Sequence, residues 1–205
     1  IKDMDKAVER IERAVANNEK IMVYGDYDVD GTTAVALVYK FLRQIGHKNL
    51  VFYIPDRYND GYGISIRGID FAARKGVTLT IALDCGIKAV EKVVYAKEKG
   101  VDFIICDHHL PADEIPAAVA VLDPKRADCN YPFDELSGCG VGFKLVQAYA
   151  MKHGIPFSEI EHLLDLLVVS IASDIVPLTG ENRILAYYGL ERLNRMPSSG
   201  LHSII

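Results

Sequence analysis

The sequence lacks any apolar stretch long enough to cross a lipid bilayer, and its first residues include Lys2, Asp3, Asp5 and Lys6. A membrane-spanning helix needs about 20 consecutive, mostly apolar residues. A secretory signal peptide needs an apolar segment behind a positively charged start. The sequence therefore predicts neither a membrane span nor a signal peptide, and we expect a cytoplasmic protein without a membrane partner.

The chain also lacks an excess of basic residues and any cysteine motif. Its formal net charge is −5, from 23 Lys and Arg against 28 Asp and Glu. A nucleic-acid-binding protein usually carries a basic surface, so composition alone argues mildly against that partner, although acids that bind metal ions would distort the count. Cys85, Cys106, Cys129 and Cys139 show no C-x-x-C spacing, which favours reduced thiols over a disulfide framework or a zinc site.

What the sequence does contain is a regular alternation of apolar runs and amphipathic segments up to about residue 124. At 205 residues, half of them hydrophobic, the chain can form one large domain or two small ones. The predicted strands are 21–24, 50–54, 78–83, 101–106 and 118–122, and the predicted helices are 6–17, 32–45, 66–75 and 88–99. This alternation is typical of an α/β fold, with a mostly parallel, doubly wound sheet and helices on both faces.

Beyond Pro124 the strand pattern does not return. The apolar spacing predicts helices over 141–153, 158–173 and 182–194. No Pro/Gly/Ser-rich linker separates this part from the sheet, so we expect the two to pack together. The expected organisation is an N-terminal helix (1–19), an α/β core (20–124) and a helical segment (125–205) that completes the same lobe. Residues 111–138 show the weakest pattern and are expected to be the loosest part.

Three aspartates, Asp26, Asp28 and Asp30, occupy alternate positions directly after the first predicted strand. In open α/β sheets the carboxyl ends of the strands face the crevice in which ligands bind. Carboxylates this close repel one another unless a cation neutralises them. We interpret the segment as part of a metal site, and the alternative is a solvated acidic turn.

Acids and histidines recur at the ends of later elements. Asp84 follows one predicted strand, Asp107, His108 and His109 follow the next, and Asp174 ends a long apolar helix. Parallel neighbouring strands would bring these groups to one edge of the sheet. Oxygen and imidazole ligands suit Mn²⁺ or Mg²⁺ better than a structural zinc. The number of carboxylates suits two ions about 3.5–4 Å apart, which can activate water and stabilise charge on a phosphoryl group.

Each of these residues also has a simpler interpretation. Asp84 could cap the helix that follows it, and adjacent histidines are often surface or packing residues. Asp174 could be an ordinary acid at a helix end, although a carboxylate there is unfavourable to the helix dipole. The metal-site interpretation depends on the conjunction of all these residues.

Together the residues resemble the four ordered motifs of the DHH phosphoesterase superfamily. The matching segments are Asp26-Tyr27-Asp28-Val29-Asp30, Asp84-Cys85-Gly86, Asp107-His108-His109 and Ser173-Asp174. The resemblance is greater still to the RecJ-type single-strand-specific DNA exonucleases. It extends to Leu110-Pro111, Ile54-Pro55-Asp56-Arg57, Gly61-Tyr62-Gly63, Ile175-Val176-Pro177-Leu178 and Asn182-Arg183, and covers about residues 20–195.

The resemblance implies 5′-to-3′ hydrolysis of single-stranded DNA, in DNA repair or recombination, with two Mn²⁺ or Mg²⁺ ions. The metal ligands that it implies are Asp26, Asp28, Asp30, Asp84, His108 and Asp174. The catalytic residues that it implies are Asp84, Asp107, His108 and His109. Asp84 would bridge the two ions and His108 would bind one of them. Asp107 would orient the histidines, and His109 would face the phosphate.

The chain departs from the family pattern in two respects. Many superfamily members have a histidine where this chain has Tyr24, which leaves one metal position short of a nitrogen ligand unless Asp26 compensates. RecJ-type enzymes also resemble a two-lobed nuclease, often with an OB-fold, and nothing after Asn194 supplies the second lobe or the OB-fold. We therefore expect the catalytic lobe alone, which binds metal but cuts DNA poorly.

Further candidates for substrate binding lie outside the four motifs. Arg57 can hold a phosphate with two hydrogen bonds, and Tyr58 and Tyr62 can stack on bases; the alternative is an ordinary turn with packed tyrosines. The glycine-rich segment 138–142 could cradle a phosphate, with Lys144 as a phosphate contact. More plainly, its glycines would let a helix start close to the sheet.

Two other functions remain open. The chain could be a phosphodiesterase for short oligonucleotides or cyclic dinucleotides, or a pyrophosphatase, which the RecJ-like segments disfavour. It could also be a non-catalytic scaffold similar to RecJ, which the complete set of motif acids disfavours. The expected partner is single-stranded DNA, and a single-strand-binding protein or a helicase are further candidate partners.

Overall fold

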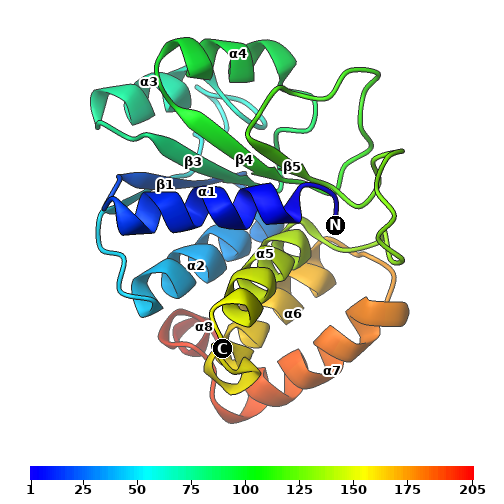
Figure 1. Ribbon diagram of the computed structural model, residues 1–205. Coiled ribbons are helices and arrows are strands. Elements are labelled where there is room, and N and C mark those ends of the chain that lie inside the picture. The colour runs from blue at the N-terminus through cyan, green and yellow to red at the C-terminus, as the bar shows by residue number, and fades with distance from the viewer.

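A five-stranded parallel sheet forms the centre of the molecule in the computed structural model, which describes residues 1–205 (Figure 1). The strands are β1 (Ile21–Gly25), β2 (Leu50–Tyr53), β3 (Leu79–Leu83), β4 (Asp102–Cys106) and β5 (Ala120–Leu122). Their order is β2-β1-β3-β4-β5, and every neighbouring pair is parallel. The chain therefore reverses its direction of growth between β1 and β3, where open α/β sheets bind ligands at their carboxyl ends. The predicted parallel α/β sheet is confirmed.

Helices cover both faces of the sheet, as Figure 1 shows. They are α1 (Met4–Ala16), α2 (Val29–Gln44), α3 (Ile66–Arg74), α4 (Val90–Glu98), α5 (Gly138–Lys152), α6 (Leu164–Ser173), α7 (Gly180–Arg195) and α8 (Ser199–Ile204). Helices α3 and α4 lie on one face, and α1, α2 and α5 lie on the other, with α6 and α7 packed beyond them. None of these helices is both long and apolar enough to span a bilayer.

Alternation along the strands divides the buried apolar residues into two cores. On β1, Ile21 and Val23 join the larger core beneath α1, α2, α5 and α6, whereas Met22 and Tyr24 join the smaller core beneath α3 and α4. Every residue of β1 and β3 is buried. Burial on both faces explains why these strands are continuous apolar runs in the sequence.

Three predicted elements differ from the structure by more than two residues or by being divided. Helix α2 begins at Val29 instead of residue 32 because the carboxylate of Asp28 caps it, accepting a hydrogen bond from Gly31 N. Helix α5 begins at Gly138 instead of residue 141 because Ser137 caps it in the same way. Glycines near a helix start hide these caps from a propensity-based prediction.

The third difference lies in the predicted helix over 158–173. It is divided into two 3-10 turns (Phe157–Glu159 and Glu161–Leu163) followed by α6. The helix α8 was not predicted.

Residues 111–138 are mostly irregular but include β5. The buried Arg126 anchors this segment by donating hydrogen bonds to Val121 O and Asp3. All four cysteines are free, as predicted.

Replacement of Gly189 by alanine should loosen the contact between α7 and α6. An added Cβ would lie 2.6 Å from Leu164 O and 2.7 Å from Val168 Cβ. Because overpacking of this kind typically costs about 1–3 kcal/mol, Gly189→Ala should lower the free energy of unfolding in urea by that amount. Gly200→Ala on α8, where a Cβ meets nothing within 4 Å, is the control and should leave stability unchanged or raise it. Equal effects of the two substitutions would contradict this packing.

Candidate metal centre

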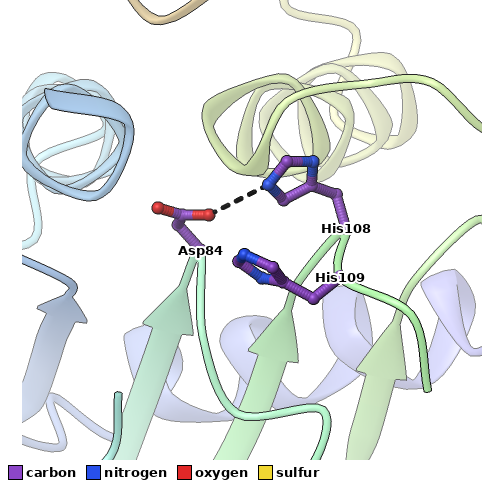
Figure 2. A group of neighbouring side chains, drawn as sticks. All are labelled: Asp84, His108 and His109. Atoms are coloured by element: carbon purple, nitrogen blue, oxygen red, sulfur yellow. Dashed lines mark ion pairs between the residues drawn. The ribbon is translucent and has the colours of Figure 1, made fainter. Parts of the chain in front are cut away.

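Side chains from three separate segments converge on the imidazole of His108, which lies on a fourth. Figure 2 shows Asp84, His108 and His109 above the carboxyl ends of the strands. His108 Nε2 lies 3.2 Å from Asp84 Oδ1, 3.6 Å from Asp174 Oδ2 and 3.7 Å from Asp30 Oδ2. Asp30 belongs to the first turn of α2, Asp84 follows β3, His108 follows β4, and Asp174 ends α6. The structure thus brings four of the predicted metal ligands together.

The spacing and the lack of hydrogen bonds fit a divalent cation. Ligands about 2.1 Å from an octahedral ion are about 3 Å from their neighbours in the shell, close to the distances found here. Asp84 Oδ1 and His108 Nε2 are both buried and have no hydrogen-bond partner. Buried polar atoms in proteins are almost always paired. A cation coordinated by these oxygen and nitrogen atoms would satisfy both of them.

Asp30 is held in place by the start of α5. Gly138 N donates to Asp30 Oδ2 at 2.7 Å, Cys139 N donates to Oδ1 at 2.8 Å, and the hydroxyl of Ser170 donates to Oδ1 at 2.7 Å. A helix N-terminus stabilises a negative charge, so this carboxylate is stabilised without a cation. The same backbone N–H groups are therefore not free to cradle a phosphate.

The glycine at position 138 is required by this close approach. A Cβ there would lie 2.5 Å from Asp84 Cβ and 2.6 Å from Asp84 Oδ1. The glycine-rich segment 138–142 thus lets a helix start against the carboxylates, which was the simpler of its two interpretations.

Ionisation of Asp84 is strongly disfavoured by its surroundings. Burial, followed by the charges of Asp30 and Asp28, raises its pKa to about 10. Its backbone lies in the left-handed region (φ 59°), which few non-glycine residues adopt. The alternative role as a helix cap is wrong, because α4 starts only at Val90 and Ala89 precedes it.

Asp107 fixes the second histidine. Its Oδ1 accepts hydrogen bonds from His109 Nδ1 at 2.7 Å and His108 N at 2.8 Å, and its Oδ2 accepts one from Ile87 N at 2.9 Å. Burial alone would raise the pKa of Asp107, but these hydrogen bonds and the charge of His109 lower it. The hydrogen bond to Asp107 in turn raises the pKa of His109. His109 is thereby held in one orientation and kept in its protonated form to higher pH.

The free side of His109 faces Tyr62. The Tyr62 hydroxyl lies 3.0 Å from His109 Nε2, and burial together with nearby carboxylates raises the pKa of this phenol. Asp107, His109 and Tyr62 also border a cavity of about 630 Å³ whose lining includes Lys88 and Lys92. Its lining also includes Glu91 and Glu114, so an open cavity with charges of both signs adjoins the cluster on the α4 side.

Two of the implied ligands have other partners. Both carboxylate oxygens of Asp26 accept backbone hydrogen bonds, from Tyr27 N and Gly63 N, and Asp28 caps α2. Two sets of ligand atoms lie within 4.8 Å of one another: those of Asp84, His108 and His109, and those of Asp30, His108 and Asp174. Neither Asp26 nor Asp28 belongs to either set. Their roles as ligands stay predictions.

Tyr24 does not stand in for a metal ligand. Its hydroxyl donates to Gly63 O at 2.8 Å and accepts from Ser65 N at 3.2 Å, and its ring stacks on Tyr53 in the smaller core. The position that holds a histidine in many superfamily members therefore has a packing role in this chain.

The predicted substrate-binding residues divide into two groups. Arg57 and Tyr58 are exposed near the site, with the Arg57 guanidinium over the ring of Tyr27. Lys144, in contrast, is mostly buried and forms an ion pair with Glu181 of α7. The role of Lys144 as a phosphate contact stays a prediction: in this structure its ammonium pairs with a carboxylate of α7, a partner that no local sequence pattern reveals.

Sequence reasoning missed two residues of the site. Ser170 precedes Asp174 by one helical turn on α6, a spacing that places both on one face. Asp123 directly follows β5, and is fully buried. The rule that identified Asp84 and Asp107, an acid at the end of a strand, would also have identified Asp123.

Stability of the metal-free protein should fall as the pH rises. The pKa of Asp84 is about 10 in the fold and 3.8 ordinarily, so between these values the folded state binds more protons than the unfolded state and the free energy of unfolding decreases. Asp84→Asn removes this titration and should flatten the profile measured by urea unfolding in EDTA. Asp5→Asn, at an exposed position of α1, should keep the wild-type slope. A wild-type profile as flat as that of Asp84→Asn would contradict the proposed carboxylate repulsion.

Comparison with known proteins yields a family and several relatives. The profile of the DHH family, N-terminal domain, matches residues 20–171. The chain is 43% identical over 205 residues to the single-stranded-DNA-specific exonuclease RecJ of Bacillus subtilis, covering 100% of this chain and 25% of that protein. It is 37% identical over 199 residues to RecJ of Escherichia coli, covering 93% of this chain and 34% of that protein.

Solved structures give the same result. A crystal structure of exonuclease RecJ bound to manganese superimposes with a TM-score of 0.89 at 30% identity, covering 100% of this chain and 51% of that one. RecJ of Thermus thermophilus in complex with Mn²⁺ superimposes with a TM-score of 0.84 at 28% identity, covering 99% and 29%. The chain spans about a quarter to a third of the length of the curated relatives it matches.

Proposed function

We propose, since this chain belongs to the DHH family, that it forms the metal-dependent catalytic part of a single-strand-specific DNA exonuclease. The observation that carries the proposal is the convergence of Asp30, Asp84 and Asp174 on His108 Nε2. The relatives described as RecJ exonucleases support the substrate and the mode of attack. Digestion from the 5′ end, a role in DNA repair or recombination, and protein partners such as a single-strand-binding protein or a helicase are parts of the same proposal.

The residues that would hold the cations are Asp30, Asp84, His108 and Asp174, with Asp26 and Asp28 as further candidates. The manganese and magnesium complexes of RecJ support Mn²⁺ or Mg²⁺ as the ion. When bound, such ions neutralise the carboxylates and stabilise negative charge on a phosphoryl group. Because burial and the neighbouring carboxylates raise the pKa of Asp84 to about 10, cation binding at neutral pH would release a proton.

His109 is the residue best placed to act on the substrate phosphate. Asp107 holds its Nδ1, so only Nε2 is available to a ligand. The hydroxyl of Tyr62 occupies that position in the free protein. A phosphate oxygen that replaces the hydroxyl would accept a hydrogen bond from His109 Nε2. The Tyr62 ring would then be free to stack on a base.

The adjoining cavity supports a nucleotide as the ligand. Its volume of about 630 Å³ lies within the range of small-molecule sites, about 300–1,000 Å³. Lys88 and Lys92 are cationic groups in its lining that could contact a phosphate, alongside the acids Glu91 and Glu114.

Loss of Asp84 should abolish metal-dependent hydrolysis. With Mn²⁺ and a 5′-labelled single strand, Asp84→Ala should lower the rate by on the order of 10²–10³, the usual effect of removing one stabiliser of transition-state charge. Calorimetry should show weakened Mn²⁺ binding in the same variant, and Asp5→Ala on α1 should behave like the wild type. Unchanged Mn²⁺ binding after the loss of Asp84 would favour a non-catalytic scaffold. Faster turnover of dinucleotides or cyclic dinucleotides than of long strands would favour the phosphodiesterase alternative.

The hydroxyl and the ring of Tyr62 should have opposite effects on substrate binding. Tyr62→Phe removes the hydroxyl that the phosphate must displace from His109, a contact worth about 0.5–1.5 kcal/mol, and should lower KM about threefold to tenfold with little change in kcat. Tyr62→Ala should raise KM about tenfold, because stacking on a base contributes about 1–3 kcal/mol. Tyr58→Phe, in the same loop with a 93% exposed side chain, controls for loss of a hydroxyl. A wild-type KM in Tyr62→Phe would show that the phosphate does not have to displace the Tyr62 hydroxyl from His109.

A further inference from the structure

Two buried polar atoms in the segments that follow the neighbouring strands β4 and β5 have no hydrogen-bond partner. Asp123 is fully buried; its Oδ1 accepts a hydrogen bond from Lys125 N at 2.8 Å, but its Oδ2 accepts none. His108 Nδ1, on the side of the ring away from Asp84, is also buried and unpaired. An unsatisfied buried donor or acceptor costs about 1–3 kcal/mol, so two such atoms on neighbouring segments call for an explanation.

Strand pairing brings Asp123 next to the segment that carries His108. Strands β4 and β5 are parallel, with Cys106 opposite Leu122, and Asp107 N donates to Leu122 O at 3.0 Å. This register places Asp123 opposite Asp107, the residue that precedes His108. Burial raises the pKa of Asp123 to about 6, with the hydrogen bond from Lys125 N and the charge of His108 opposing the rise and the charge of Asp107 adding to it.

The chemistry of a metal-binding histidine requires a partner at the second ring nitrogen. In a neutral imidazole one nitrogen carries the proton and the other offers a lone pair. His108 Nε2 faces the carboxylates (Figure 2), so its lone pair is available only when the proton resides on Nδ1. Metal-binding histidines almost always donate this N–H to a carboxylate, a backbone carbonyl or a water molecule.

We propose that Asp123 is a positioning residue for His108 and acts through one buried water molecule. The water accepts a hydrogen bond from His108 Nδ1–H and donates one to Asp123 Oδ2. The two atoms form no direct hydrogen bond, and a water molecule is the group that commonly joins two buried polar atoms of this kind. Asp123 thereby selects the tautomer that directs the Nε2 lone pair towards Asp30, Asp84 and Asp174. The inference rests on the proposed metal centre and adds to it a residue outside the four motifs.

A purely structural role would use only half of the Asp123 carboxylate. The hydrogen bond from Lys125 N occupies Oδ1 and stabilises the turn after β5. That role leaves Oδ2 buried without a function, and it predicts no effect on the protonation of His108. The two roles therefore differ in a measurable property of the histidine ring.

The substitution Asp123→Asn should reverse the tautomer of His108. The asparagine oxygen must accept from Lys125 N, so its NH₂ group takes the place of Oδ2 and donates to the water. The water then donates to Nδ1, which moves the ring proton to Nε2. Nitrogen-15 NMR of the metal-free protein should show a protonated Nδ1 in the wild type and a protonated Nε2 in Asp123→Asn, with the His108 signals identified by their loss in His108→Gln.

The same variant should bind Mn²⁺ about tenfold to a hundredfold more weakly in calorimetry, the usual effect of removing a partner of a metal-binding histidine. Asp165→Asn is the matched control. Asp165 is likewise fully buried and accepts backbone hydrogen bonds, from Leu166 N and Ser198 N, at the opposite end of α6 from Asp174. Asp165→Asn should lower stability but leave the His108 tautomer and Mn²⁺ affinity unchanged.

An unchanged His108 tautomer in Asp123→Asn would overturn the proposal, whatever the stability of the variant. If the variant does not fold, a high-resolution crystal structure of the wild type decides: a water bonded to both His108 Nδ1 and Asp123 Oδ2 supports the proposal, and its absence refutes it. Neither measurement uses DNA, so failure of the exonuclease assignment is recognised separately, by Mn²⁺ binding without hydrolysis.

Discussion

Electrostatic repulsion among carboxylates at the carboxyl edge of the sheet is the constraint on which the site depends. Asp30, Asp84 and Asp174 all face His108 Nε2, and both Asp30 and Asp84 are buried. A buried carboxylate is stable only when it is protonated, hydrogen-bonded or paired with positive charge. Asp30 has hydrogen bonds from the start of α5, and Asp84 retains a proton in the free protein. The resulting cluster is prepared for a divalent cation and costs the protein stability without one.

The two faces of the sheet contribute different parts of the site. The face covered by α2, α5 and α6 supplies the buried carboxylates, and the face covered by α3 and α4 supplies Tyr62 and the lysines of the open cavity. Asp107 links the two parts, because one of its oxygens accepts from Ile87 N in the loop before α4 and the other from His109. Tyr62, His109 and Asp107 are therefore joined by two successive hydrogen bonds, so a change of substrate contact at Tyr62 can affect both of the other residues.

Much of this arrangement was predictable from local patterns. The alternation of apolar runs with amphipathic helices implied a parallel sheet, and acids at the ends of β3 and β4 then had to share an edge. The same rule applies to Asp123, which directly follows β5. The ion pair of Lys144 was not predictable in this way, because its partner, Glu181, is 37 residues away on a helix whose position depends on packing against α6.

Local sequence patterns were enough to predict the succession of strands and helices as far as α7, the family, and most of the acids and histidines that reach the carboxyl edge, because hydrophobic periodicity and strand-end position are local properties. How each acid is used depends on contacts that form only in the folded protein. Asp26 and Asp30 look equivalent in the sequence, yet Asp26 accepts hydrogen bonds from Tyr27 N and Gly63 N, whereas Asp30 faces His108 and is held by Gly138 N, 108 residues away. Such contacts follow from how helices pack on the sheet, and no local pattern encodes them.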